Sequence, residues 1–189
     1  MSDPRKERTL FLIKPDGVKK GLIGETIRRI ENVGLKIVAL KVVKPTREFA
    51  EGHLPKEKEW VIGLGNKTLN DYKTTGQDPV KEMGSADPYE IGKIIKEWLV
   101  EYLTSGIMVA GIAQGSRAIE FVRKLMGNTN PILADSGSIR GDFSNDSPAQ
   151  ANSEKRAIAN ITHASGDPKE AAQEIANWFK PEEIIDYED

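Results

Sequence analysis

The order of strands and helices predicted along the 189-residue sequence indicates an α/β fold, built as an α+β sandwich. Three observations support this prediction. Short apolar runs rich in β-branched residues alternate with segments whose apolar residues recur at helical spacing. Turn-forming residues separate the two kinds of segment. Two of the helical segments open with the same Asp-Pro-x-Glu signature. The resulting order resembles a ferredoxin-like βαββαβ antiparallel sheet with added helices.

The first strand is predicted at residues 8–13, an apolar run closed by a Pro-Asp-Gly turn. A helix is expected next, because Ile23, Ile27 and Ile30 share one helical face. Gly34 then stands where a helix C-cap belongs, which predicts the end of that helix. The chain therefore opens with a strand–helix pair.

Residues 35–43 form the second predicted strand, because this run is rich in β-branched residues and stops before Pro45. A short helix is expected after Thr46, whose hydroxyl suits an N-cap. Asp87 and Asp167 each cap a later helix and are followed by proline at the first helical position, where no amide hydrogen is needed.

The second half continues the alternation. Residues 107–113 read as a buried strand, and a helix is predicted from near Ser116 to Gly127. We expect a long polar loop from there to about Ala157, and then a last short strand near residues 158–162. The sequence thus supplies four strands with helices between them.

Two stretches, residues 55–86 and 142–156, are polar and turn-rich and show no clear periodicity. Neither has enough apolar residues to form a core of its own. We therefore interpret both as surface excursions from one compact core.

Composition excludes several classes of protein. The 27 Lys and Arg residues against 29 Asp and Glu give a net charge of −2, which argues against a dedicated nucleic-acid binder. The absence of Cys excludes disulfide scaffolds and thiol nucleophiles, and two His cannot build a three-His metal site. No apolar stretch is long enough for a signal peptide or a membrane span, so a soluble cytoplasmic protein without a membrane partner is expected.

His163 is the notable candidate nucleophile. It ends a predicted strand and precedes a flexible Ala-Ser-Gly turn. A neutral imidazole accepts a phosphoryl group readily near pH 7. Glu174 lies at the edge of an apolar helical stripe, where its carboxylate can hold one ring nitrogen while the other attacks. The alternative is that His163 is a polar residue at a strand end and Glu174 a solvated helix residue.

Several residues have the chemistry to bind an anion. Lys14 directly follows the first strand and can project toward a phosphate as a point charge. Arg123 and Arg140 can bind phosphate oxygens bidentately, and Thr129 and Asn160 can add neutral hydrogen bonds. Taken singly, each is equally compatible with a solvated charge or a loop cap. Neither a P-loop nor a Rossmann glycine pattern offers a rival phosphate site.

Four segments resemble the nucleoside diphosphate kinase family in sequence and in order. They are KPDGV at residues 14–18, GNTNP at 127–131, IRGDF at 139–143 and NITHAS at 160–165. The ordered set is very specific and spreads over most of the chain.

The resemblance implies a single kinase-like domain over residues 1–189, with insertions at about 55–93 and 142–156. It implies a ping-pong reaction in which His163 attacks the γ-phosphate of a nucleoside triphosphate, forms a phosphohistidine, and passes the phosphoryl group to a nucleoside diphosphate. Mg²⁺ is the implied cofactor, held mainly through nucleotide phosphates and water and not by protein ligands. A homo-oligomer is expected.

The family's remaining roles also map onto residues of this sequence. The resemblance assigns phosphate binding to Lys14, Arg123, Arg140 and Thr129, and contact with the ribose to Asn160. It assigns support of the histidine to Ser165 and Glu174, and contact with the base to Ile95 and Leu99.

The sequence also departs from the family pattern. Leu54 stands after His53 where the family has Tyr, and Ile95 replaces the base-stacking Phe. The insertion at about residues 55–93 adjoins the expected entrance for the base, so we hypothesise that it caps or reshapes the base pocket. The alternative function is a nucleotide-binding regulatory module with reduced or no kinase turnover.

Overall fold

The computed structural model describes residues 6–187. These residues form two compact units. The first unit takes the described residues up to Lys44, Gly106–Asn145, and those from Asn160 onward. The second unit takes Pro45–Ser105 and Asp146–Ala159. The candidate nucleophile and all of the candidate phosphate ligands lie in the first unit.

The first unit is built on a four-stranded antiparallel sheet. Its strands are β1 (Glu7–Ile13), β2 (Lys36–Val43), β3 (Met108–Gly115) and β4 (Thr162–Ala164), in the order β2-β3-β1-β4. β1 pairs with β3 along its whole length, and its last three residues pair with β4. This strand order and pairing confirm the predicted ferredoxin-like sheet.

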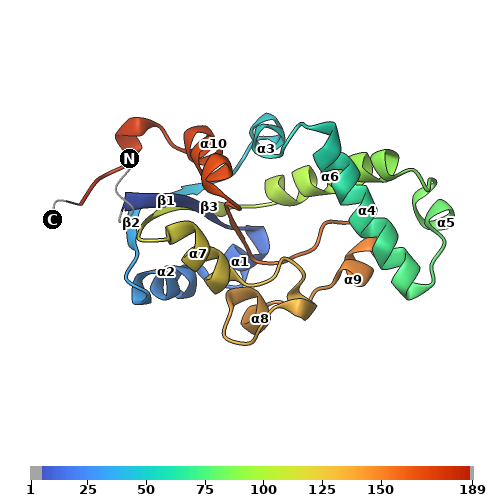
Figure 1. Cartoon of the computed structure of the whole chain (residues 1–189), viewed down its shortest axis with the longest axis horizontal. Coiled ribbons are helices and arrows are strands. Elements are labelled where there is room, and N and C mark those ends of the chain that lie inside the picture. Colours follow the sequence, from blue (N-terminus) through green and yellow to red (C-terminus); the bar gives the residue numbers. More distant parts are fainter. Residues whose placement is uncertain (1–5, 188–189) are drawn as a thin grey trace. The chain divides into compact units, whose positions relative to one another are not determined.

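Helices cover both faces of this sheet. They are α1 (Pro15–Lys19), α2 (Ile23–Asn32), α7 (Ala118–Met126), α8 (Ile139–Phe143) and α10 (Pro168–Trp178), with short 3-10 helices η2 (Pro131–Leu133) and η3 (Pro181–Glu183). In Figure 1, α2 and α7 lie on one side of the sheet and α10 on the other. Coverage on both sides explains why the four residues from Leu10 to Ile13 are fully buried.

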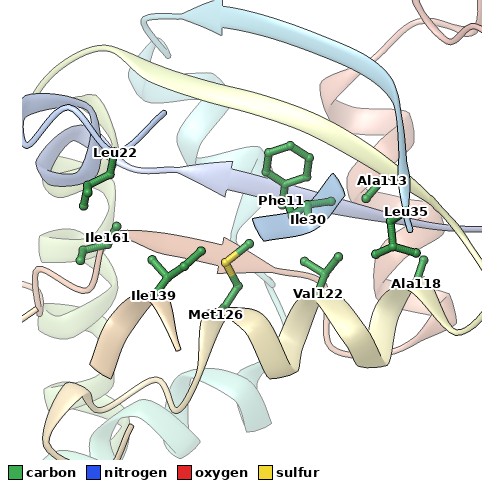
Figure 2. Packing of buried hydrophobic residues seen from close by; sticks show 10 residues of the cluster. All are labelled: Phe11, Leu22, Ile30, Leu35, Ala113, Ala118, Val122, Met126, Ile139 and Ile161. Carbon is green, nitrogen blue, oxygen red and sulfur yellow. The ribbon is translucent and has the colours of Figure 1, made fainter. Parts of the chain in front are cut away.

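Large apolar side chains fill the space between the sheet and α7. Figure 2 shows Phe11 of β1 with Val122 and Met126 of α7 in one cluster, to which Ile139 and Ile161 also belong. The ring of Phe11 crosses the neighbouring strand at Gly111, where an added Cβ would lie 2.2 Å from Phe11 Cζ. The glycine inside the third strand therefore makes room for this ring.

The second unit is helical. Its helices are α3 (Arg47–His53), α4 (Lys58–Thr75), α5 (Pro79–Met83), α6 (Pro88–Thr104) and α9 (Pro148–Ser153). α6 packs against both α3 and α4, and α9 packs against α4. The predicted caps form as expected: Thr46 accepts a hydrogen bond from Phe49 N at 3.2 Å, and Asp87 accepts from the amides of Tyr89 and Glu90.

Residues 55–86 show no clear periodicity in the sequence, yet they form α4 and α5. α4 buries Val61, Gly65, Thr68 and Tyr72, which follow helical spacing. Two of these four positions carry Gly and Thr, so an apolar pattern is missing although a buried face exists.

Glycine is required on this face because two helix backbones meet there. An added Cβ on Gly65 of α4 would lie 1.8 Å from the carbonyl oxygen of Pro88, and one on Gly92 of α6 would lie 1.9 Å from that of Val61. The two glycines therefore allow α4 and α6 to pack more closely than side chains permit.

The predicted polar loop up to Ala157 was wrong, because it contains η2, α8 and α9. These helices are only three to six residues long, too short to show periodicity. Each begins at a side-chain cap: Asn130 accepts from Ile132 N, Ser138 from Gly141 N, and Ser147 from Gln150 N.

The last strand lies at Thr162–Ala164, and not at residues 158–162 as predicted. The reason is a tight turn at residues 160–162, in which the amide of Thr162 donates to the carbonyl of Asn160 at 2.7 Å. This turn delays entry into the sheet. His163 is therefore the central residue of β4, where it pairs with Leu12 of β1.

Candidate active site

His163, Glu174 and Ser165 form a hydrogen-bonded group in the first unit. His163 Nε2 lies 2.7 Å from Glu174 Oε1, and Ser165 Oγ donates to Glu174 Oε2 at 2.6 Å. Ser165 is fully buried and Glu174 is 7% exposed, whereas the His163 side chain is 27% exposed. The carboxylate is thus enclosed, while the imidazole reaches the surface.

The sequence of α10 explains how Glu174 reaches the histidine. Asp167 caps the helix by accepting from the amides of Lys169 and Glu170 at 2.8 and 2.9 Å. Ala171, Glu174 and Trp178 share the buried face that the predicted apolar stripe defines. The carboxylate therefore points from the packed side of α10.

This arrangement determines the tautomer of His163. With the Glu174 carboxylate as acceptor, Nε2 carries the ring proton. The lone pair of the neutral imidazole is then on Nδ1. The negative charge of the Glu174 carboxylate, beside Nε2, also stabilises the positive charge that the ring gains when Nδ1 forms a bond.

Lys14 lies at the end of β1 and is only 8% exposed. Its Nζ donates to Asn160 Oδ1, and Asn160 Nδ2 donates to the backbone oxygen of Thr129 at 2.7 Å. Asn160 is itself 4% exposed. The three residues therefore form a chain of hydrogen bonds from the sheet to the loop that follows α7.

Burial first, and the nearby Arg140 guanidinium second, lower the pKa of Lys14 from 10.5 to about 7, while Asp16 opposes the shift. Near neutral pH this ammonium is therefore close to losing its proton. A bound anion favours the charged form, so a phosphate at this position raises the pKa of Lys14 again.

Arg140 is 7% exposed and binds backbone carbonyls. Its Nε, Nη1 and Nη2 donate to the oxygens of Asn160, Gly127 and Thr162 at 3.2, 2.7 and 2.7 Å. The predicted phosphate ligand therefore also fixes the backbone on either side of Ile161.

Arg123 lies on α7, near the loop that follows His163. An added Cβ on Gly166 would lie 3.3 Å from Arg123 Nη1. The helix thus brings a guanidinium to the segment that directly follows the nucleophile, as a phosphate-binding role requires.

The first unit brings together most of the predicted site residues through shared contacts: His163, Glu174, Ser165, Lys14, Asn160, Arg140 and Thr129. Arg123 belongs to the same unit. The predicted base contacts, Ile95 and Leu99, lie one turn apart on α6 in the second unit, and both are half-buried.

Sequence reasoning missed Asp16. Its Oδ2 accepts from the amide of Ile161 at 3.0 Å, two residues before the candidate nucleophile. A signal was present, because Asp16 stands inside the KPDGV segment that carries the family resemblance.

A model of the family described as "Nucleoside diphosphate kinase" matches residues 7–61 and 90–184. The chain belongs to the nucleoside diphosphate kinase family. Residues 62–89, which lie outside the match, contain most of α4 and all of α5.

Related members of the kinase family cover nearly the whole chain. A nucleoside diphosphate kinase of Pyrobaculum aerophilum is 49% identical over 95% of this chain and 98% of its own length. That of Archaeoglobus fulgidus is 38% identical over 96% of this chain and 92% of its own length. Because these alignments leave so little of the chain unmatched, the segment outside the family model has counterparts in both relatives.

Solved structures of the kinase family are also similar to this chain. The crystal structure of an NDP kinase from Pyrobaculum aerophilum matches with a TM-score of 0.94 at 48% identity, covering 96% of this chain and 100% of that one. The Borrelia burgdorferi nucleoside-diphosphate kinase, solved as a transition state mimic with bound vanadate and ADP, matches with a TM-score of 0.76 at 33% identity, covering 99% and 95%. Among residues 6–187, no helix is long and apolar enough to cross a membrane.

Proposed function

We propose that this chain is an active nucleoside diphosphate kinase that transfers the γ-phosphate of a nucleoside triphosphate to a nucleoside diphosphate through a phosphohistidine on His163. The observation that carries the proposal is the contact between His163 Nε2 and the buried carboxylate of Glu174 at 2.7 Å. It gives the partly exposed imidazole the tautomer that a nucleophile needs.

In the first half-reaction, the lone pair of Nδ1 attacks the γ-phosphorus. A bond forms between Nδ1 and phosphorus, and the bond from phosphorus to the oxygen that bridges to the β-phosphate breaks. The nucleoside diphosphate leaves with that electron pair. Glu174, held in place by Ser165, stabilises the charged phosphoimidazole ring.

In the second half-reaction, a terminal oxygen of an acceptor nucleoside diphosphate attacks the same phosphorus. The bond between Nδ1 and phosphorus breaks, and its electron pair returns to the ring. His163 regains its starting state, so one site serves donor and acceptor in turn.

The cations supply most of the remaining catalysis, because phosphoryl transfer depends on positioning and on neutralising charge. Lys14 provides an ammonium beside Asn160, and Arg123 provides a guanidinium beside the loop after His163. Arg140 adds a third positive charge close to Lys14. Thr129 and Asn160 complete the set as neutral contacts for phosphate and ribose.

The residues around His163 fit Mg²⁺ as an ion held by the nucleotide. The carboxylate oxygens of Glu174 accept from His163 and Ser165, and Asp16 accepts from Ile161 N. The other charged groups named above are cations, so this donor set offers no carboxylate cage. A Mg²⁺ bound through phosphate oxygens and water suits it, and when bound it neutralises charge on the phosphates.

The Borrelia burgdorferi relative also supports the proposal. That kinase binds vanadate with ADP as a transition state mimic. Vanadate takes the geometry of a phosphoryl group in transfer, and ADP is the diphosphate that such a transfer leaves or consumes. We infer the same ligand classes, nucleoside di- and triphosphates, for the present chain.

The decisive experiment incubates the purified protein with γ-labelled ATP and Mg²⁺ and tests the stability of the protein-bound label. A label that is labile in acid and stable in alkali is expected, because a phosphohistidine has these properties. His163→Ala should abolish it, whereas His53→Ala, at the other histidine of the sequence, should keep it. Nucleotide binding without such a label would instead identify a regulatory module.

Further parts of the proposal concern organisation and setting. We expect a homo-oligomer in the cytoplasm, with no membrane partner and no nucleic-acid partner. Two further statements stay predictions. One is that the chain is a single kinase-like domain with insertions at about residues 55–93 and 142–156. The other is that the first insertion caps the base pocket formed with Ile95 and Leu99.

A further inference from the structure

The turn before β4 is strained. The amide of Thr162 donates to the oxygen of Asn160 two residues earlier, which defines a γ-turn with Ile161 at its centre. Ile161 has a φ of +69°, a value that β-branched residues rarely adopt. Such a conformation persists only where its surroundings hold it.

The segment after β1 holds the turn from one side. Asp16 Oδ2 accepts from the amide of Ile161 at 3.0 Å, and the amide of Lys14 donates to the oxygen of Ile161 at 2.7 Å. Gly17 lies so close that an added Cβ would be 2.9 Å from the same oxygen. Three of the residues in the KPDG segment thus contact the central residue of the turn.

Arg140 holds the turn from another side. Its Nε and Nη2 donate to the oxygens of Asn160 and Thr162, the residues that flank Ile161. Because Ile161 itself is fully buried, the strained residue is enclosed as well as hydrogen-bonded. Asp16 adds a hydrogen bond from its side chain to the amide of Ile161.

The geometry of the turn sets the position of two functional groups. Asn160, at its start, holds the ammonium of Lys14. His163 lies two residues after Ile161 and enters the sheet opposite Leu12. If Ile161 relaxed to a negative φ, the partner of Lys14 and the nucleophile would both shift.

We propose that Asp16 is a positioning residue, whose carboxylate holds the γ-turn at Ile161 and through it aligns His163 and Asn160 for phosphoryl transfer. This inference rests on the proposed function. It assigns a role to a residue of the KPDGV segment that acts through the backbone turn before the nucleophile.

The test measures the rate of His163 labelling by γ-labelled ATP at saturating nucleotide, for Asp16→Ala and Asp16→Asn. Asp16→Ala should lower this rate by about ten- to a hundredfold, because a misplaced nucleophile loses its alignment. Asp16→Asn keeps an oxygen that can accept from Ile161 N, so most of the rate should return. Asp78→Ala is the matched control, since Asp78 also accepts from one backbone amide, that of Val80, on the helix α5; its rate should match the wild type.

A double-mutant cycle with Ile161→Gly separates the turn from other effects of Asp16. Glycine adopts positive φ without strain, so the turn then needs less support. The loss caused by removing Asp16 should be several-fold smaller in the Ile161→Gly background. Thermal unfolding of each variant shows whether it is folded. If Asp16→Ala does not fold, the cycle is completed with Asp16→Leu, which keeps the shape of the side chain but has no oxygen to accept from Ile161 N.

Four outcomes are distinguishable. Equal rates for Asp16→Ala and the wild type would overturn the inference, and so would equal losses in the wild-type and Ile161→Gly backgrounds. An Asp16→Asn rate as low as that of Asp16→Ala would assign the effect to charge and likewise overturn it. A wild-type protein that takes up no label contradicts the proposed function instead.

Discussion

The two units of this chain differ in their internal packing. In the first, large side chains such as Phe11 and Met126 fill the space between sheet and helix. In the second, α4 and α6 meet through Gly65 and Gly92, with helix backbones in place of side chains at the contact. A hydrophobic pattern therefore reveals the first kind of core and conceals the second. The chemistry-bearing motifs also lie in the first unit, whereas the second carries the segment outside the family model.

The largest expected effect tests whether α4 depends on its glycine contact. Gly65→Val would place side-chain atoms where the Pro88 oxygen lies, only 1.8 Å from an added Cβ. Neither backbone can yield without separating the helices, so we expect a loss of about 3 kcal/mol or more in the free energy of unfolding. Chemical denaturation followed by circular dichroism measures it.

Gly63→Ala is the matched control on the same helix. An added Cβ there meets nothing within 4 Å, so alanine should stabilise α4 by up to about 1 kcal/mol. Equal stability changes for the two variants would show that the close contact between α4 and α6 contributes nothing.

The second prediction concerns Glu174, the proposed carboxylate partner of His163. Glu174→Gln keeps the shape of the side chain but removes the charge that stabilises the ring of His163. We expect His163 labelling to slow about a hundredfold, with a small change in stability, because a hydrogen bond to a developing charge acts mainly in the transition state. Rapid-quench labelling measures the rate. A stability loss as large as that of Gly65→Val, with little change in rate, would make the residue structural.

Much of the first unit could be predicted because its signals are local. The Asp167 cap, the apolar strand at residues 8–13 and the motif around His163 each depend on neighbouring residues in the sequence. The pairing of Glu174 with His163 was also accessible, since it follows from one helical stripe and one strand end.

The rest depends on contacts between distant segments. Gly65 resembles a helix breaker until Pro88 is placed against it, and Asp16 resembles a turn residue until Ile161 is placed beside it. The short helices α8 and α9 escape notice because a single serine cap is a weaker signal than a periodic face. Tertiary context decides each of these positions.

A pH-dependent effect comes from Lys14, which links the stability of the first unit to its proposed chemistry. Its pKa is about 7 in the folded chain and 10.5 in the ordinary, unfolded state. Between these values the unfolded chain binds more protons than the folded one, so the contribution of Lys14 to stability rises with pH across this window. The Lys14→Met variant has no group that titrates at this position. Without nucleotide, the unfolding free energy of the wild type, measured relative to that of Lys14→Met, should therefore increase from pH 7 to pH 10.5.

Nucleotide binding should follow the opposite course, because it needs the charged ammonium. Above pH 7 the wild type loses that charge, so its affinity for a nucleoside diphosphate should fall while that of Lys14→Met changes little. Urea unfolding and calorimetric titration across the same pH range measure the two quantities. Parallel stability curves for the two proteins would mean that Lys14 keeps an ordinary pKa, and burial at the end of β1 would then have no electrostatic consequence. Opposite slopes for stability and affinity would show that the first unit keeps Lys14 buried at a cost in stability that nucleotide binding offsets.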